Sequence, residues 1–152
     1  MPKNKQHAYP GNKMFGYRVT PLTPATPVPA GWLRGWKVVY VGPRGGLSSP
    51  GSCRGLRRYA PRKITVPLRG LGPLAVFNTK ANALQFIRTE FHPLARPTLV
   101  CIRCAYKPST KTRAWCLTPN MYQELRWMAE GSRLADAVLL LDGVQKEVAY
   151  AR

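Results

Sequence analysis

The sequence predicts an α+β fold: a mixed or mainly antiparallel sheet with about two helices, preceded by an extended, Pro-rich basic arm. Three observations support this prediction. Residues 74–106 carry a strand–helix–strand pattern, an Asp-Gly pair near the C-terminus separates two apolar runs, and prolines interrupt the first 32 residues. We therefore expect the arm at residues 1–32 and one α+β domain at residues 33–152.

The strand–helix–strand unit begins with the apolar run Leu74–Phe77. Asn78 or Thr79 can cap a helix, because either side chain can accept a hydrogen bond from a free backbone N–H. Apolar residues then recur at helical spacing, at Leu84, Ile87 and Phe91. Prolines end the helical region, at Pro93 and Pro97. Thr98–Tyr106, rich in apolar and β-branched residues, predicts the second strand.

Two strands are expected before this unit. Trp36–Val41 is apolar on both faces, which indicates a covered, central strand. Ile64–Leu68 contains Pro67, which lacks a backbone N–H, so we expect an edge strand or a strand end there.

A second helix and a hairpin are expected after the unit. Thr118-Pro119 is a typical helix start, Gly131 suits a C-terminal cap, and a helical stripe lies between them at Met121, Leu125 and Met128. The hairpin would join Ala137–Leu141 to Val144–Tyr150 through Asp142-Gly143.

The positive charge is concentrated in the first part of the chain. The 152 residues carry 24 Lys and Arg against 6 Asp and Glu, a formal net charge of +18. All six acids lie at or after Glu90, so residues 1–89, with 15 Lys and Arg, carry +15. A field of this sign attracts polyanions such as nucleic acid, an acidic protein face or an anionic membrane surface. The alternative is a solvated basic surface with no such partner.

Basic residues gather in the arm and in the segment Arg54–Lys63. Arginine donates two parallel hydrogen bonds to phosphate, and aromatic rings can stack on bases. We expect the nucleic-acid or polyanion contacts at Lys3, Lys5, Lys13, Arg18, Arg54, Arg57, Arg58, Arg62, Lys63 and Arg69. No sequence-reading motif accompanies them, so binding should be directed at the phosphate backbone.

The cysteines and histidines do not form a recognisable catalytic or metal centre. Cys101 and Cys104 have zinc-like spacing, and Cys53 and Cys116 could complete the site. On a strand, however, residues 101 and 104 point to opposite faces, so buried thiols are expected instead of zinc. No nucleophile is paired with His7 or His92, and no phosphate loop is present. We therefore expect no metal, no cofactor and no catalytic residue.

A short pattern runs through Trp36-Lys37-Val38-Val39, Tyr59, Gly72–Thr79, Ala83 and Phe86. It resembles a loosely defined group of small proteins from phage, large-virus and environmental genomes, over about half the chain. Some members are distantly similar to the ADP-ribosyltransferase fold. The resemblance would imply an early-strand Arg or His, for which Arg34 and His7 are available, and a late-strand glutamate, for which Glu147 is the candidate.

Together these features predict a non-enzymatic structural component of a large assembly, first of all a minor, capsid-associated virion protein. It would dock on other protein subunits through its domain and lay its arm on neighbours or nucleic acid. The alternatives are a sequence-nonspecific nucleic-acid-binding or ribonucleoprotein component and an ADP-ribosyltransferase-like enzyme or inactive relative. No apolar run is long enough for a membrane span, and no signal-peptide core is present, so we expect an intracellular location in a virion or nucleoprotein particle.

Overall fold

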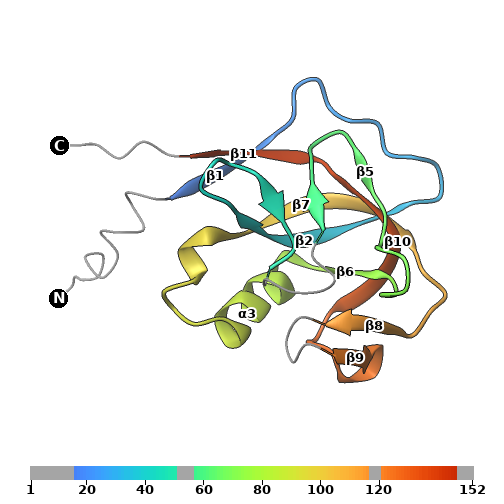
Figure 1. Cartoon of the computed structure of the whole chain (residues 1–152). Coiled ribbons are helices and arrows are strands. Elements are labelled where there is room, and N and C mark those ends of the chain that lie inside the picture. The colour runs from blue at the N-terminus through green and yellow to red at the C-terminus, as the bar shows by residue number, and fades with distance from the viewer. Residues whose placement is uncertain (1–15, 51–56, 117–120, 147–152) are drawn as a thin grey trace, which may run out of the picture.

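The central strand is β7 (Leu99–Pro108), which pairs antiparallel with β2 (Leu33–Val41) and with β10 (Ser132–Leu140). The structure is a computed structural model and describes residues 16–50, 57–116 and 121–146 (Figure 1). β6 (Leu74–Phe77) also pairs with both β2 and β10. Trp36 of β2 faces Arg103 of β7 and Phe77 of β6 at once, so these two partners lie on opposite edges of β2. β2, β7, β10 and β6 therefore form a closed ring of antiparallel strands.

Shorter strands extend this ring, and two small sheets lie beside it. β3 (Leu47–Ser48) and β4 (Arg58–Tyr59) continue the sheet from β2, and β5 (Ile64–Thr65) pairs with β10. A separate pair is formed by β1 (Tyr17–Pro21) and β11 (Asp142–Lys146), and another by β8 (Arg113–Cys116) and β9 (Met121–Glu124).

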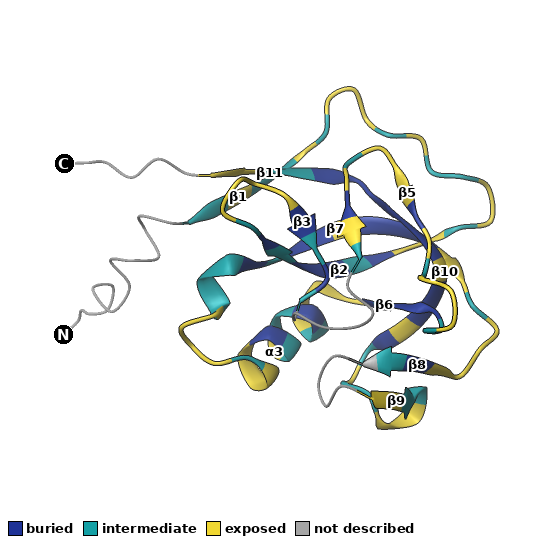
Figure 2. Cartoon of the chain, viewed as in Figure 1, coloured by how far each residue is buried: buried dark blue, intermediate teal, exposed yellow. Residues whose placement is uncertain are grey.

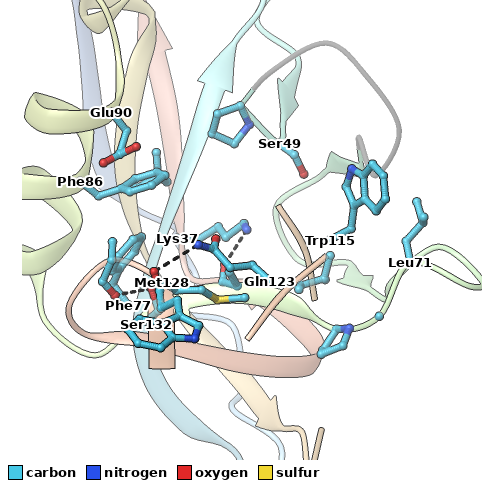
Figure 3. Close-up of a pocket in the computed structure, with 18 of the residues that line it drawn as sticks. Lys37, Ser49, Leu71, Phe77, Phe86, Glu90, Trp115, Gln123, Met128 and Ser132 are labelled. Carbon is cyan, nitrogen blue, oxygen red and sulfur yellow. Dashed lines mark hydrogen bonds between the residues drawn. The ribbon is translucent and has the colours of Figure 1, made fainter. Parts of the chain in front are cut away.

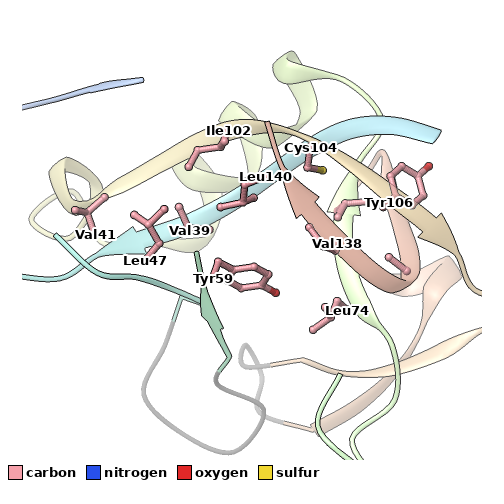
Figure 4. Packing of buried hydrophobic residues seen from close by; sticks show 12 residues of the cluster. Val39, Val41, Leu47, Tyr59, Leu74, Ile102, Cys104, Tyr106, Val138 and Leu140 are labelled. Atoms are coloured by element: carbon pink, nitrogen blue, oxygen red, sulfur yellow. The ribbon is translucent and has the colours of Figure 1, made fainter. Parts of the chain in front are cut away.

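The main core fills the inside of the ring (Figure 4). Its most enclosed side chains come from four different strands: Val39, Val76, Ile102, Val138 and Leu140 are at most 1% exposed. Burying each such side chain stabilises the fold by roughly 1.5–3 kcal/mol. β7 and β10 also bury much of their outer faces, which explains why apolar residues occupy both faces of each strand (Figure 2).

The outer faces are covered from two directions. Helix α3 (Lys80–Glu90) packs Ala83 and Ile87 against the side of β2 and β7 that carries Val38 and Cys101. On another part of the outer surface, Val28 and Trp32 cover Ala105, Leu139 and Leu141.

The predicted strand–helix–strand unit is confirmed. The Thr79 side chain accepts a hydrogen bond from the Asn82 N–H at 3.1 Å, which caps α3, and the helix ends at Phe91. A short 3-10 helix, η1 (Arg96–Thr98), leads into β7. The strand at Trp36–Val41 lies within β2, and β5 is the expected edge strand, shortened to Ile64–Thr65 before Pro67.

The predicted second helix is wrong, because α3 is the one α-helix among the described residues. Residues 121–127 form β9 and the 3-10 helix η2 (Leu125–Trp127) instead. Tyr122 pairs with Trp115 across the β8–β9 ladder, and their rings meet edge to face at 5.3 Å. This pairing overrides the helical spacing, and Met121, expected in a core stripe, is 53% exposed. Thr118-Pro119 lies outside the described residues.

The predicted C-terminal hairpin is also wrong. β10 pairs with β5, β6 and β7, and β11 pairs with β1, so the two strands on either side of Leu141 do not pair with each other. Asp142 does not serve as a turn residue. It is 4% exposed and binds Arg103, and its backbone continues into β11. Residues after Lys146 lie outside the described part.

Part of the expected arm contributes a strand to the fold. β1 pairs with β11 from Tyr17 opposite Lys146 to Pro21 opposite Asp142. Tyr17 and Val19 pack against the main core. Residues 1–15 lie outside the described part of the chain. In the described ranges no helix has the length and apolarity that a membrane crossing would need.

Candidate nucleic-acid interface

The two-stranded sheet of β8 and β9, together with η2, projects from the ring as a separate unit that we call the ribbon (residues 113–116 and 121–127; Figure 1). Backbone hydrogen bonds attach it to the preceding turn and loop: Trp115 N–H donates to Leu71 O at 3.1 Å, and Leu125 N–H donates to Thr112 O at 2.7 Å. The Tyr122 hydroxyl donates to Gly70 O. These contacts fix the ribbon against the turn at residues 69–72.

Cationic and aromatic side chains are interleaved on the ribbon. The Arg113 guanidinium lies 5.5 Å from the Tyr122 ring centroid, and the Arg126 guanidinium lies 5.5 Å from that of Trp127. Trp127 is 68% exposed and Tyr122 39%. Exposed rings provide stacking faces for bases, and exposed guanidinium groups provide donors for phosphate oxygens. The carboxylate in this stretch is Glu124, opposite Arg113 in the ladder.

A surface depression lies where the ribbon meets the turn. Its volume is about 480 Å³, and it is lined by Gly70, Gly72, Thr110, Lys111, Thr112, Arg113 and Tyr122. Gly72 has φ +77°, and a Cβ there would lie 3.2 Å from Arg113 O. Glycine therefore permits the close approach that forms the floor. The lining includes Lys111 and Arg113, whose charges attract an anion.

The structure describes six of the ten predicted contact residues. Arg18 lies exposed on β1, away from the ribbon, and takes part in an interaction of its own. Arg57 is half-buried, and Arg58 is exposed on β4. Arg62 and Lys63 occupy the turn between β4 and β5, where Arg62 donates to Pro24 O at 2.8 Å. The remaining four lie outside the described residues: Lys3, Lys5, Lys13 and Arg54.

Arg69 is the predicted residue that the fold brings to the ribbon, because it precedes Gly70 in the attached turn. The structure therefore connects the basic segment of residues 57–69 to a second basic group that the sequence prediction missed: Lys111, Arg113 and Arg126, with the rings of Tyr122 and Trp127. The basic composition of residues 107–113 was a usable signal. The spacing of residues 121–128 predicts a helix, so the sequence does not indicate that the Tyr122 and Trp127 rings lie beside these cations.

Cys101 and Cys104 are buried thiols, as expected. Cys101 belongs to the cluster under α3 and Cys104 to the core of the ring, so they lie on opposite faces of β7. Burial raises the pKa of Cys104 to about 12 and raises that of Cys101 as well. In the described ranges no three potential ligands gather around a metal position. Cys53 lies outside these ranges.

The structure describes one of the three residues that the family resemblance implies. Arg34 is exposed on β2, and His7 and Glu147 lie outside the described residues. The resemblance and the activity it implies stay predictions. His92 has a local turn role, since its Nδ1 accepts a hydrogen bond from the Leu94 N–H at 3.1 Å.

Comparison of the chain with protein-family models, curated proteins and solved structures finds no match in any of the three.

Proposed function

We propose that the protein is a non-enzymatic structural component of a nucleoprotein assembly that binds the phosphate backbone of nucleic acid through the ribbon and the adjoining turn. The observation that carries this proposal is the grouping of Lys111, Arg113, Arg126 and Arg69 with the exposed rings of Tyr122 and Trp127. Cations that follow a backbone and rings that stack on bases are the combination used by proteins that bind single strands without sequence preference.

A minor virion protein is the particular assembly component that we propose. The support is the charge distribution, with +15 in residues 1–89 and no acid there, together with the proline-rich composition of residues 1–32. A strongly cationic chain is attracted to packaged nucleic acid and to acidic subunit faces. The basic residues 57–69 would then extend the contact surface beyond the ribbon.

The test uses the full chain and labelled oligonucleotides, single-stranded and double-stranded, in fluorescence anisotropy at 50 and 200 mM salt. If four cations contact the backbone, affinity for the single strand should fall about fifty-fold over this range, because bound counterions are released. An affinity that does not change with salt would contradict phosphate binding. A preference for the single strand is expected, since duplex bases offer no free faces to the rings.

A further inference from the structure

A second site lies on the other side of the ribbon. It is a cavity of about 450 Å³ between the ribbon, α3 and the sheet (Figure 3). Aromatic rings form much of its wall: Phe77, Phe86, Phe91, Trp115 and Trp127. The volume falls within the range of small-molecule sites, which are mostly apolar with a few placed polar groups.

One placed polar group is Lys37, on strand β2. The residue is 6% exposed, and its Nζ donates a hydrogen bond to Ala75 O at 2.7 Å (Figure 3). The Tyr59 ring centroid lies 5.2 Å from Nζ. The aliphatic part of the chain is enclosed by the sheet, and the ammonium group reaches the cavity.

In the described part of the chain Lys37 has no anionic partner. No carboxylate there forms an ion pair with it, and the carboxylate among the lining residues belongs to Glu90, which is exposed on the last turn of α3. The Cys104 thiol does not supply a counter-charge, since burial keeps it protonated with a pKa of about 12. An ammonium group has three N–H donors, and buried charges in proteins are normally paired. One donor is used by Ala75 O, so a charged group with unused donors faces an apolar cavity.

We propose that this cavity binds a small amphipathic carboxylate, with the carboxylate on Lys37 Nζ and the aliphatic or aromatic body between the rings of α3 and the ribbon. Charge complementarity selects the head group, because a carboxylate pairs with the buried ammonium and accepts its unused N–H groups. The apolar wall favours a ligand whose remaining part is aliphatic or aromatic. An inorganic anion would make no apolar contact with the rings of the wall. A neutral apolar molecule would leave the Lys37 ammonium group without a counter-charge. This proposal does not rest on the nucleic-acid function proposed above, although both sites use the Trp127 ring.

The test compares three ligands of equal chain length, decanoate, decanol and decylamine, with the full chain below micelle-forming concentrations. Titration calorimetry gives affinity and stoichiometry, and tryptophan fluorescence reports on Trp115 and Trp127. Decanoate should bind with one-to-one stoichiometry about tenfold or more tightly than decanol, and decylamine should bind least. This comparison needs no variant, so it does not depend on a substitution that folds.

Lys37→Met then tests the assigned residue. Methionine keeps the unbranched shape and removes the charge, so decanoate should lose its advantage over decanol while decanol binding stays unchanged. Lys80→Met is the matched control, because Lys80 is exposed over the Trp36 ring outside the cavity. Equal binding of decanoate and decanol by the unaltered protein, no binding of either, or a carboxylate preference that survives Lys37→Met would each overturn the proposal.

Discussion

Beyond the end of β10, the Asp142 carboxylate accepts hydrogen bonds from both the side chain and the backbone N–H of Arg103. The guanidinium Nη2 lies 2.6 Å from Asp142 Oδ1, and the Arg103 N–H donates to Oδ2 at 3.2 Å. The Asp142 side chain is 5% exposed and the Arg103 side chain 45%. The side-chain hydrogen bond that Arg103 donates to Asp142 raises the pKa of Arg103 above its ordinary value. This pair holds the chain at the point where it leaves β10 for β11, and so fixes the direction of the C-terminal strand.

Asp142→Asn should therefore destabilise the fold. The substitution removes the negative charge that faces Arg103 and leaves at most one good acceptor, so we expect a loss of about 1–2 kcal/mol, discounted because Arg103 is partly solvated. Urea denaturation measures the change. Asp136→Asn, at an exposed position in β10, is the control and should stay within about 0.5 kcal/mol of the unaltered protein. Equal stability of the two variants would show that the Arg103–Asp142 pair is dispensable.

Two truncations should distinguish the contribution of β1 to stability from that of the residues before it. Removing residues 1–15 leaves β1 whole and serves as the reference truncation in urea unfolding. Removing residues 1–21 also deletes β1, which exposes the edge of β11 and uncovers core surface under Tyr17 and Val19. A clearly lower midpoint is expected for the longer truncation. If both truncations behave alike, β1 does not contribute to stability.

Alkaline pH should weaken the fold through Cys104. Burial raises its pKa from 9.0 to about 12, so below pH 9 the folded and unfolded chains both hold the proton. Between these values the unfolded chain releases the proton while the folded chain keeps it, so the free energy of unfolding falls as pH rises. The raised pKa of Tyr106 acts in the same direction.

The measurement is the free energy of unfolding from pH 8 to pH 11 for the unaltered protein and for Cys104→Ala. Loss of packing in Cys104→Ala lowers the free energy of unfolding by the same amount at every pH. The difference in free energy of unfolding between the two proteins therefore reports on ionisation of the thiol, and it should shrink by a few kcal/mol as pH rises. Parallel curves would contradict a buried, protonated thiol. Mass mapping after alkylation at pH 8 should find Cys101 and Cys104 modified only in denaturant.

Neutralising the ribbon should weaken nucleic-acid binding. In the double variant Lys111→Gln with Arg113→Gln, affinity for a single-stranded oligonucleotide at 50 mM salt should fall about tenfold. The slope of log affinity against log salt should decrease in magnitude by about 1.4, since each lost phosphate contact removes about 0.7. The double variant Lys80→Gln with Arg88→Gln, at two exposed positions of α3, also removes two positive charges and should leave the slope nearly unaltered. The same loss in the control would indicate a general charge effect instead of a defined interface.

The strand–helix–strand unit was predictable because its signals are local. Thr79 caps the helix with its own side chain, prolines end it, and the apolar spacing of Leu84 and Ile87 matches the face that packs. The cysteines were predictable for the same reason, since alternation along one strand sends residues 101 and 104 to opposite faces.

The two wrong predictions have a common cause. The spacing of Met121, Leu125 and Met128 fits a helix, and Asp142-Gly143 fits a turn, when each segment is considered alone. In the structure Tyr122 packs against Trp115, and Asp142 accepts hydrogen bonds from Arg103, a residue 39 positions away. These contacts with other segments outweigh local propensities that differ by less than about 1 kcal/mol per residue.

The sequence by itself determined the α+β class, the capped helix, the central strands, the buried thiols and the position of the positive charge. Each of these depends on neighbouring residues or on composition. Tertiary structure decided the closure of the ring, the pairing of β1 with β11, the ribbon with its interleaved rings and cations, and the placement of Lys37 beneath an apolar cavity. These features depend on which distant segments meet, and that choice minimises exposed apolar surface and unpaired buried polar groups over the whole chain.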